Sequence, residues 1–387
     1  MANNSAIRTM FEEGDQMRAK YGRENVFDFS LGNPDAPTPP EVKQAIKEIV
    51  EEEPDLILHG YMSNAGFEDV RETIARHINK TQGTNFSKKN ILMTVGAASG
   101  LNVALKTILN PGEEVVIFTP YFLEYNWYVN NYDGVVVQAP TDKKTFQPDL
   151  KAFEKLVGDK TRVVLINSPH NPTGVVYSEE TIKGIANILK KKQKELNRAI
   201  FIIADEPYRE LAYDGVEVPY ITKYYENTIV AYSYSKSLSL PGERIGYLVI
   251  PDELEESELV FDTASNANRI LGCVNAPSLQ QKVIAKCVDA KVDLDYYDRN
   301  RKALYEGLKD CGFECIMPQG AFYLFVKSPV EDEAEFCKTA KKYNILMVPG
   351  SAFAGPGYVR LAYCVSYETI QNSLPGFKKL AQEYGLR

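Results

Sequence analysis

Short apolar segments alternate with helical patterns through the middle of this 387-residue chain. Seven of these segments are rich in β-branched and other apolar residues, which is typical of strands buried on both faces of a sheet. They span residues 91–95, 115–118, 135–139, 163–168, 199–205, 228–233 and 245–250. Amphipathic helical patterns lie between them, as at 101–109 and 178–192. The alternation predicts an α/β fold with a mostly parallel seven-stranded sheet sandwiched by helices.

The last hundred residues follow a different pattern and predict a second, smaller α+β domain. A long helical stretch at 277–309 precedes short strand-like runs at 322–326, 345–348 and 358–363, with a helix near 333–342 and another at the end. We expect residues 1–50 to join this smaller domain, which otherwise spans 286–387. Residues 51–285 then form the large domain. A ligand site between the two domains is the default expectation.

Composition and charge exclude several classes of protein. Hydrophobic residues at 44% and charged residues at 25% are ordinary globular proportions, and no apolar run approaches the ~18 residues of a membrane span. The net charge of −8 argues against a nucleic-acid partner, which would need a basic face. The polar start Met1-Ala2-Asn3-Asn4-Ser5 has no apolar signal core, so a cytoplasmic location is expected.

The cysteines and histidines predict no metal site. The six cysteines contain no C-x-x-C pair, and the chain has only three histidines, so a Cys/His zinc site has few possible ligands. Free thiols in a reducing compartment are the simpler interpretation.

The chemical signals of the chain fall at the ends of the predicted strands, where open α/β sheets bind ligands. Lys236 follows the strand at 228–233, and Arg244 stands eight residues later. Ser233, Ser235 and Arg244 together could bind a phosphate, the arginine through two parallel hydrogen bonds. Burial near other cations would lower the pKa of Lys236 and free its amine to attack a carbonyl. A polar loop with an exposed lysine explains the same residues about equally well.

Three further segments also follow predicted strands. The small residues of Gly96-Ala97-Ala98-Ser99-Gly100 would let backbone N–H groups and a helix N-terminus bind an anion. Asp205 ends an apolar strand and would need a cation, such as a protonated pyridine nitrogen. In the proline-rich segment 167–174, Asn171 could bind a ring oxygen. A tight turn, an N-capping aspartate and ordinary turn chemistry are the respective alternatives.

Together, these segments resemble the fold type I enzymes that use pyridoxal 5′-phosphate (PLP), specifically the class I/II aminotransferases. The likeness runs from Ser30-Leu31-Gly32-Asn33-Pro34-Asp35 to Tyr358-Val359-Arg360-Leu361, with Asn-Pro-Thr-Gly, Asp-Glu-Pro-Tyr and the Lys236 segment in the family's order and spacing. It implies an aminotransferase that moves an amino group between an L-amino acid and a 2-oxo acid, with 2-oxoglutarate as the expected acceptor. The implied mechanism is ping-pong, through an aldimine of Lys236.

The resemblance also implies roles for single residues toward the cofactor. Lys236 matches the Schiff-base lysine that also moves the proton. Asp205 matches the partner of the pyridinium. Asn171 and Tyr208 match the residues that contact the phenolic oxygen. Tyr121 matches the aromatic residue that stacks on the ring. The phosphate contacts are Gly96, Ala97, Ala98, Ser233, Ser235 and Arg244.

Substrate and subunit contacts follow from the same resemblance. Arg360 matches the arginine that binds the substrate α-carboxylate, helped by Asn171 and the backbone of Gly32. A structural salt bridge is the alternative for this arginine. Tyr61 matches a tyrosine that reaches the phosphate of the neighbouring subunit, which implies a homodimer with shared sites.

The substrate stays open at this level. Some bacterial aspartate aminotransferases of this group carry a lysine at the position of Ala98 to bind a second carboxylate, and this chain has none. Tyr121, Tyr125 and Tyr128 would suit an aromatic or mid-sized apolar amino acid, although core packing explains tyrosines equally well. A PLP-dependent carbon–sulfur β-lyase of the same fold is the main alternative, and a PLP-sensing regulatory protein is another.

Overall fold

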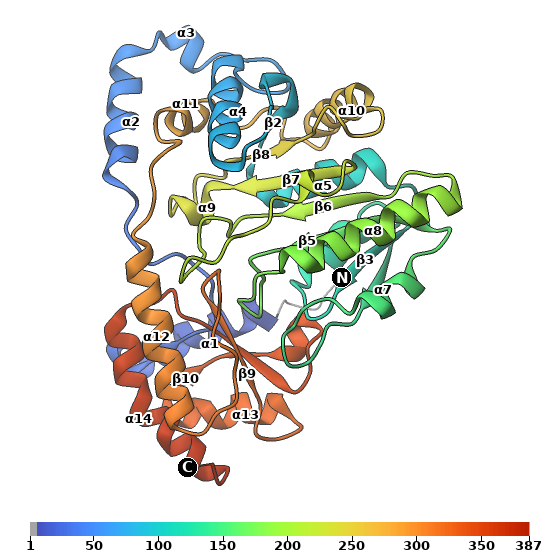
Figure 1. The fold of residues 1–387 in the computed structure, drawn as a ribbon. Coiled ribbons are helices and arrows are strands. Elements are labelled where there is room, and N and C mark those ends of the chain that lie inside the picture. Colours follow the sequence, from blue (N-terminus) through green and yellow to red (C-terminus); the bar gives the residue numbers. More distant parts are fainter. Residues whose placement is uncertain (1–5, 387) are drawn as a thin grey trace.

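Seven strands form the central sheet of the protein, which a computed structural model describes over residues 6–386 (Figure 1). Their order is β2-β8-β7-β6-β5-β3-β4, and only β8 runs antiparallel to the others. The strands are β2 (Ile91–Thr94), β3 (Glu114–Phe118), β4 (Val135–Ala139), β5 (Thr161–Asn167), β6 (Phe201–Asp205), β7 (Thr228–Ser233) and β8 (Gly246–Val249). Each predicted strand is therefore present, and the predicted α/β fold class is confirmed. The polar residues 1–5 lie outside the described part of the chain.

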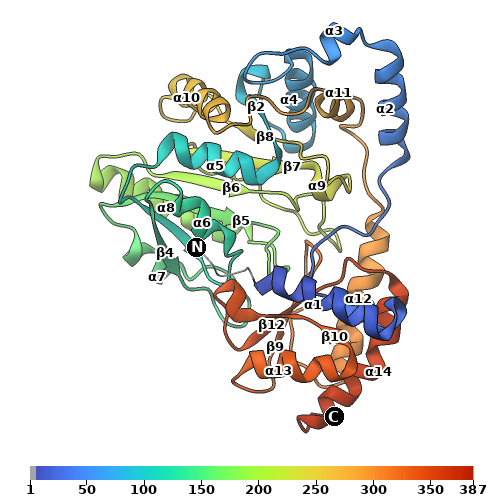
Figure 2. The same cartoon turned by 180° about the vertical axis from the view of Figure 1, so that it is seen from behind.

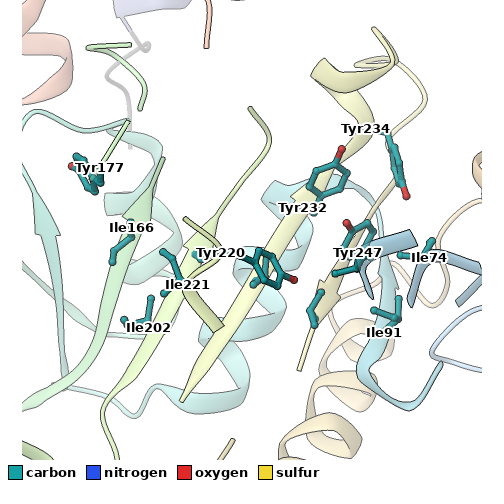
Figure 3. Close-up of a cluster of buried hydrophobic side chains, with 14 of the residues drawn as sticks. Ile74, Ile91, Ile166, Tyr177, Ile202, Tyr220, Ile221, Tyr232, Tyr234 and Tyr247 are labelled. Atoms are coloured by element: carbon teal, nitrogen blue, oxygen red, sulfur yellow. The ribbon is translucent and has the colours of Figure 1, made fainter. Parts of the chain in front are cut away.

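Helices cover both faces of this sheet, with α8 in front of it in Figure 1 and α5 in front of it in Figure 2. Within β5, Val164 and Ile166 belong to the hydrophobic cluster beneath α8, whereas Val163 and Leu165 belong to the cluster beneath α5. Successive side chains of a strand point to opposite faces, so a strand covered on both sides must be apolar throughout. Figure 3 shows part of the first cluster, with Ile166 and Ile202 on neighbouring strands.

The helices of the larger part vary in length. They are α2 (Pro40–Glu52), α3 (Asp55–Leu58), α4 (Glu68–Gln82), α5 (Gly96–Ile108), α6 (Glu124–Asn130), α7 (Leu150–Leu156), α8 (Glu179–Leu196), α9 (Tyr234–Ser237), α10 (Ser257–Ile270) and α11 (Ser278–Lys286). The short α9 follows β7 directly and carries Lys236.

A second hydrophobic cluster joins the two ends of the chain, below the large sheet in Figure 1. Its strands are β9 (Tyr323–Lys327), β11 (Val348–Pro349) and β12 (Tyr358–Ala362) in one antiparallel sheet, and β1 (Phe27–Asp28) paired with β10 (Ile345–Leu346). Its helices are α12 (Leu294–Asp310), α13 (Glu333–Ala340) and α14 (Tyr367–Glu383), whereas α1 (Ala6–Tyr21) packs through Met10 in a small separate cluster with Val26 and Leu346. The pairing of β1 with β10 ties the N-terminal segment to the C-terminal part of the chain.

Two details differ from the sequence-based expectations. The helical stretch predicted at 277–309 is two helices, because α11 ends at Lys286 and Asp293 caps a new helix, α12, by accepting the backbone N–H groups of Asp295 and Tyr296. The predicted segment 1–50 is also split, since Val42 and other residues of α2 pack in the cluster of the large sheet. The boundaries after residues 50 and 285 stay a prediction.

Candidate active site

A cavity of about 890 Å³ opens at the carboxyl ends of the parallel strands and reaches β9 and β12 of the smaller sheet. Such an edge is where ligands bind in open α/β sheets. Most of the residues singled out from the sequence line this cavity, although they are spread over more than 300 positions of the chain. They are Gly32, Ala97, Ala98, Asn171, Asp205, Tyr208, Ser233, Ser235, Lys236, Arg244 and Arg360.

Lys236 presents its amine to the cavity from α9. Ser233 caps this short helix by accepting the backbone N–H of Ser235, and the Lys236 Nζ atom donates to the Gly32 carbonyl at 2.8 Å. No carboxylate of residues 6–386 forms an ion pair with it. Burial, aided by the charges of Arg360 and Arg244, lowers the pKa of Lys236 to about 8, although the nearby Cys364 opposes the shift. A substantial fraction of neutral amine is therefore present near neutral pH.

Asp205 ends β6 as a buried carboxylate with one oxygen unused. Its Oδ2 atom accepts the Tyr125 hydroxyl at 2.6 Å, while Oδ1 has no hydrogen-bond partner within the described chain. Burial raises the pKa of Asp205 to about 7, and the hydrogen bond from Tyr125 opposes this shift. A buried carboxylate with a free oxygen is suited to accept a hydrogen bond from a cationic ligand group.

The first turn of α5, which begins at Gly96, lies against Arg244 from the loop after α9. Arg244 donates only to the backbone carbonyls of Pro241 (3.0 Å) and Val95 (3.4 Å), and it has no carboxylate partner in the part of the chain that is described. Its φ of 55° is in the left-handed region, which is uncommon for a side chain this long and is often associated with function. Gly96 makes room for it, since a Cβ there would lie 2.7 Å from Arg244 Nη2.

Arg360 is a buried cation without a carboxylate. Only 2% of the residue is exposed, yet its Nη1 and Nη2 atoms donate to neutral acceptors, Asn171 Oδ1 at 3.1 Å and the Ser30 carbonyl at 2.7 Å. Its Nε atom has no partner among residues 6–386. The structural salt bridge considered for this arginine is therefore absent from the described chain. An unpaired buried guanidinium is suited to bind a ligand carboxylate.

Three residues named from the sequence do not line this cavity. Tyr121 is buried beside it, and its hydroxyl donates to Asn126 while accepting from Gln138. Gly96 leaves the space that the Arg244 side chain occupies. Tyr61 is 96% exposed and borders a separate pocket of about 240 Å³ with His59 and Cys273.

Several cavity residues carry no signal in the sequence. Phe122, and not Tyr121, is the aromatic residue of the Thr-Pro-Tyr-Phe turn on the cavity wall. Tyr323, the first residue of β9, reaches the cavity beside Tyr208 and Arg360. An aromatic residue in an apolar strand is ordinary core composition, so only its neighbours in space distinguish Tyr323.

Of the three histidines, His170 is the buried one. His170 is buried against Tyr177, bonds Thr173 Oγ1 at 2.7 Å, and has its pKa lowered to about 3 by burial, which fits a structural role. Within residues 6–386 no group of three or more His, Cys, Asp or Glu residues could hold a metal ion. No helix in the same range is both long and apolar enough to cross a membrane.

Known proteins match this chain over nearly its full length. The sequence profile of the family described as "Aminotransferase class I and II" matches residues 24–375. A crystal structure titled as an amino transferase from Eubacterium rectale superimposes with a TM-score of 0.97 at 48% identity, covering 99% of this chain and 96% of that one.

Two curated relatives are similar at lower identity. An aspartate aminotransferase from Thermotoga maritima is 33% identical, with 91% of this chain and 90% of that protein covered. "Aromatic-amino-acid aminotransferase 2" from Thermococcus litoralis is 30% identical, with 99% and 97% covered.

Proposed function

The chain belongs to the class I and II aminotransferases, and we propose that it moves the amino group with PLP bound in the cavity around Lys236. One observation carries the cofactor assignment: the cavity unites Lys236, Asp205 and Arg360, and none of the three has an ion-pair partner within the described chain. A fold that leaves three ionisable side chains uncompensated in one cavity is arranged for a charged ligand.

The residues present fit the chemical groups of PLP. Arg244, the Ser233 and Ser235 hydroxyls and the N-terminus of α5 are donors suited to a phosphate. The free Oδ1 atom of Asp205 suits a protonated pyridine nitrogen. The Asn171 amide and the Tyr208 hydroxyl suit a phenolic oxygen. For the aromatic ring we assign the wall contact to Phe122, because Tyr121 is not exposed to the cavity.

The residues of the chain then have the following tasks. When bound, the cofactor supplies an aldehyde and an electron-withdrawing ring. Lys236 would hold the cofactor through its amine and would move the proton at the substrate α-carbon, for which its lowered pKa is suited. Arg360 binds the α-carboxylate with Asn171, so the α-carbon is held near the Lys236 amine. Asp205 keeps the ring nitrogen protonated.

The substrates we propose are an L-amino acid and a 2-oxo acid, with 2-oxoglutarate as the acceptor. The relatives named above as aspartate and aromatic-amino-acid aminotransferases support transamination, and the β-lyase alternative is not favoured. The experiment is a panel of single amino acids added to the PLP-loaded protein. Loss of the visible absorbance band with release of the matching 2-oxo acid but no ammonia indicates transamination, whereas release of pyruvate together with ammonia without an acceptor contradicts it.

A homodimer with shared sites is the proposed assembly. Tyr61 is almost fully exposed at 96%, and apolar Leu56 (91%), Ile57 (51%) and Ile270 (64%) are exposed too. A second copy that covered them would remove apolar surface from water. Mixing Lys236→Ala with Tyr61→Ala subunits tests this: recovered activity in the mixture supports sharing of residues, and a purely monomeric active enzyme contradicts it.

The cytoplasm is the proposed location. The six cysteines are all free thiols, which fits a reducing compartment. Fractionation of cells that express a tagged chain would test it, and recovery outside the cytoplasmic fraction would contradict it.

A further inference from the structure

We propose that Tyr323 is a positioning residue that fixes the Tyr208 hydroxyl and the Arg360 guanidinium at once, and so couples the cofactor side of the site to the substrate side. The inference rests on the proposed function, which assigns Tyr208 to the phenolic oxygen and Arg360 to the α-carboxylate.

The first contact joins two buried hydroxyl groups. The Tyr323 and Tyr208 hydroxyl oxygens are 2.9 Å apart, and their rings meet edge to face with centroids 5.7 Å apart. Burial raises the pKa of Tyr323 to about 12 and raises that of Tyr208 well above its ordinary value, so both carry their protons. The hydrogen bond between the two hydroxyl groups uses only one of their two protons. When Tyr323 donates to Tyr208, the Tyr208 proton remains free for an acceptor in the cavity.

The second contact holds the substrate-binding cation. The Arg360 guanidinium lies 4.5 Å from the Tyr323 ring centroid and 4.4 Å from that of Phe353, so two aromatic rings contact it where no carboxylate does. Backbone pairing brings this about, because Ala362 pairs with Tyr323 and Arg360 with Phe325. Residues two apart on a strand point to the same face, which makes Arg360 and Tyr323 diagonal neighbours.

The third contact places Tyr323 against the backbone that holds Lys236. A Cβ at Gly32 would lie 2.1 Å from the Tyr323 hydroxyl oxygen, a distance that no side chain could tolerate. The carbonyl of the same Gly32 accepts the Lys236 amine at 2.8 Å. Because Gly32 has no side chain, Tyr323 can lie close to the Lys236 amine, the Tyr208 hydroxyl and the Arg360 guanidinium.

Two variants separate the two functions of the side chain. Tyr323→Phe removes the hydroxyl and keeps the ring, so Tyr208 becomes a weaker donor. The pKa at which the visible band of the PLP-loaded protein titrates should rise, by up to about one unit, with little change in KM. Tyr323→Leu also removes the ring, and KM for the amino acid should rise about 3- to 30-fold.

A double-mutant comparison and a matched control complete the test. Tyr208→Phe with Tyr323→Phe should titrate like Tyr208→Phe alone, because the hydroxyl of Tyr323 acts through Tyr208. Tyr213→Phe, which loses another buried hydroxyl bond (to the Ala321 carbonyl, 2.6 Å), should change the melting temperature but not that pKa. An unshifted pKa in Tyr323→Phe, or an unchanged KM in Tyr323→Leu, would overturn the inference. Absence of a visible band and of any half-reaction in the unmodified protein would instead overturn the proposed function.

Discussion

The Tyr125 hydroxyl donates to Asp205 Oδ2 at 2.6 Å and leaves Oδ1 free, so the two oxygens of this buried carboxylate have different environments. Tyr125 lies in the helix α6, whereas Asp205 is the last residue of the strand β6. The tyrosine thus fixes the rotation of the carboxylate and directs its free oxygen to a ligand. In the proposed function that ligand group is the ring nitrogen of PLP.

Replacing Tyr125 by Phe should therefore weaken PLP binding. The hydrogen bond to a charged acceptor contributes about 1.5–3 kcal/mol, so the dissociation constant should increase about 10- to 150-fold. Titration of the cofactor-free protein with PLP measures it. Tyr343→Phe is the matched control, because the Tyr343 hydroxyl also donates to a carboxylate, Glu383, at 2.6 Å, but on the exposed surface. Equal PLP affinity in Tyr125→Phe and the unmodified protein would contradict this role.

Asp205 should make the cofactor-free protein less stable as the pH rises. Its folded-state pKa of about 7 is above the ordinary value of 3.8, so its favourable contribution is complete below about pH 4 and is lost between about pH 4 and pH 7. Asp205→Asn does not titrate, and it should be more stable than the unmodified chain at pH 8 by a few kcal/mol, with little difference at pH 4. Melting curves of both cofactor-free proteins from pH 4 to 8 test this. Parallel pH profiles would show that Asp205 titrates normally.

Lys236 should react as an amine at a lower pH than an ordinary lysine. Because its pKa is lowered to about 8, labelling of Lys236 by an aldehyde with borohydride trapping should rise with pH and level off above about 8. Peptide mass spectrometry measures the labelled fraction, with the denatured chain as reference. Arg360→Met removes one cation that lowers this pKa and should move the curve to higher pH. A curve identical to that of the denatured chain would refute the shift.

Arg301 and Arg360 are both fully buried, but removing their charges should affect the stability of the protein differently. Arg301 pairs with Asp214 and Asp298 at 2.6 Å, so Arg301→Met should destabilise the protein by roughly 2–4 kcal/mol. Arg360 has no carboxylate partner among residues 6–386, so Arg360→Met should leave the cofactor-free protein as stable or more stable, while KM for the amino acid rises about 30- to 1000-fold. Urea unfolding and steady-state kinetics measure both. A large loss of stability in Arg360→Met would identify a structural cation.

The sequence predicted the strands well because each one is a local apolar pattern. All seven short apolar runs predicted between 91 and 250 are strands of the large sheet. The prediction of one continuous helical stretch at 277–309 was wrong, because a capping aspartate, Asp293, starts a new helix inside that pattern. Nor could the sequence tell that Phe122 lines the cavity and Tyr121 does not, because neighbouring aromatic residues in one turn are not distinguished by pattern.

By itself, then, the sequence determined the α/β architecture and the ordered motifs around Lys236, Asp205 and Arg244, since both depend on residues close together in the chain. Only the tertiary structure decided that Arg360 lacks a carboxylate, that Tyr125 fixes Asp205, and that Tyr323 contacts Tyr208 and Arg360. These contacts join residues from different sheets and helices. They depend on strand register and on the packing of distant segments, and no local pattern of side chains specifies either.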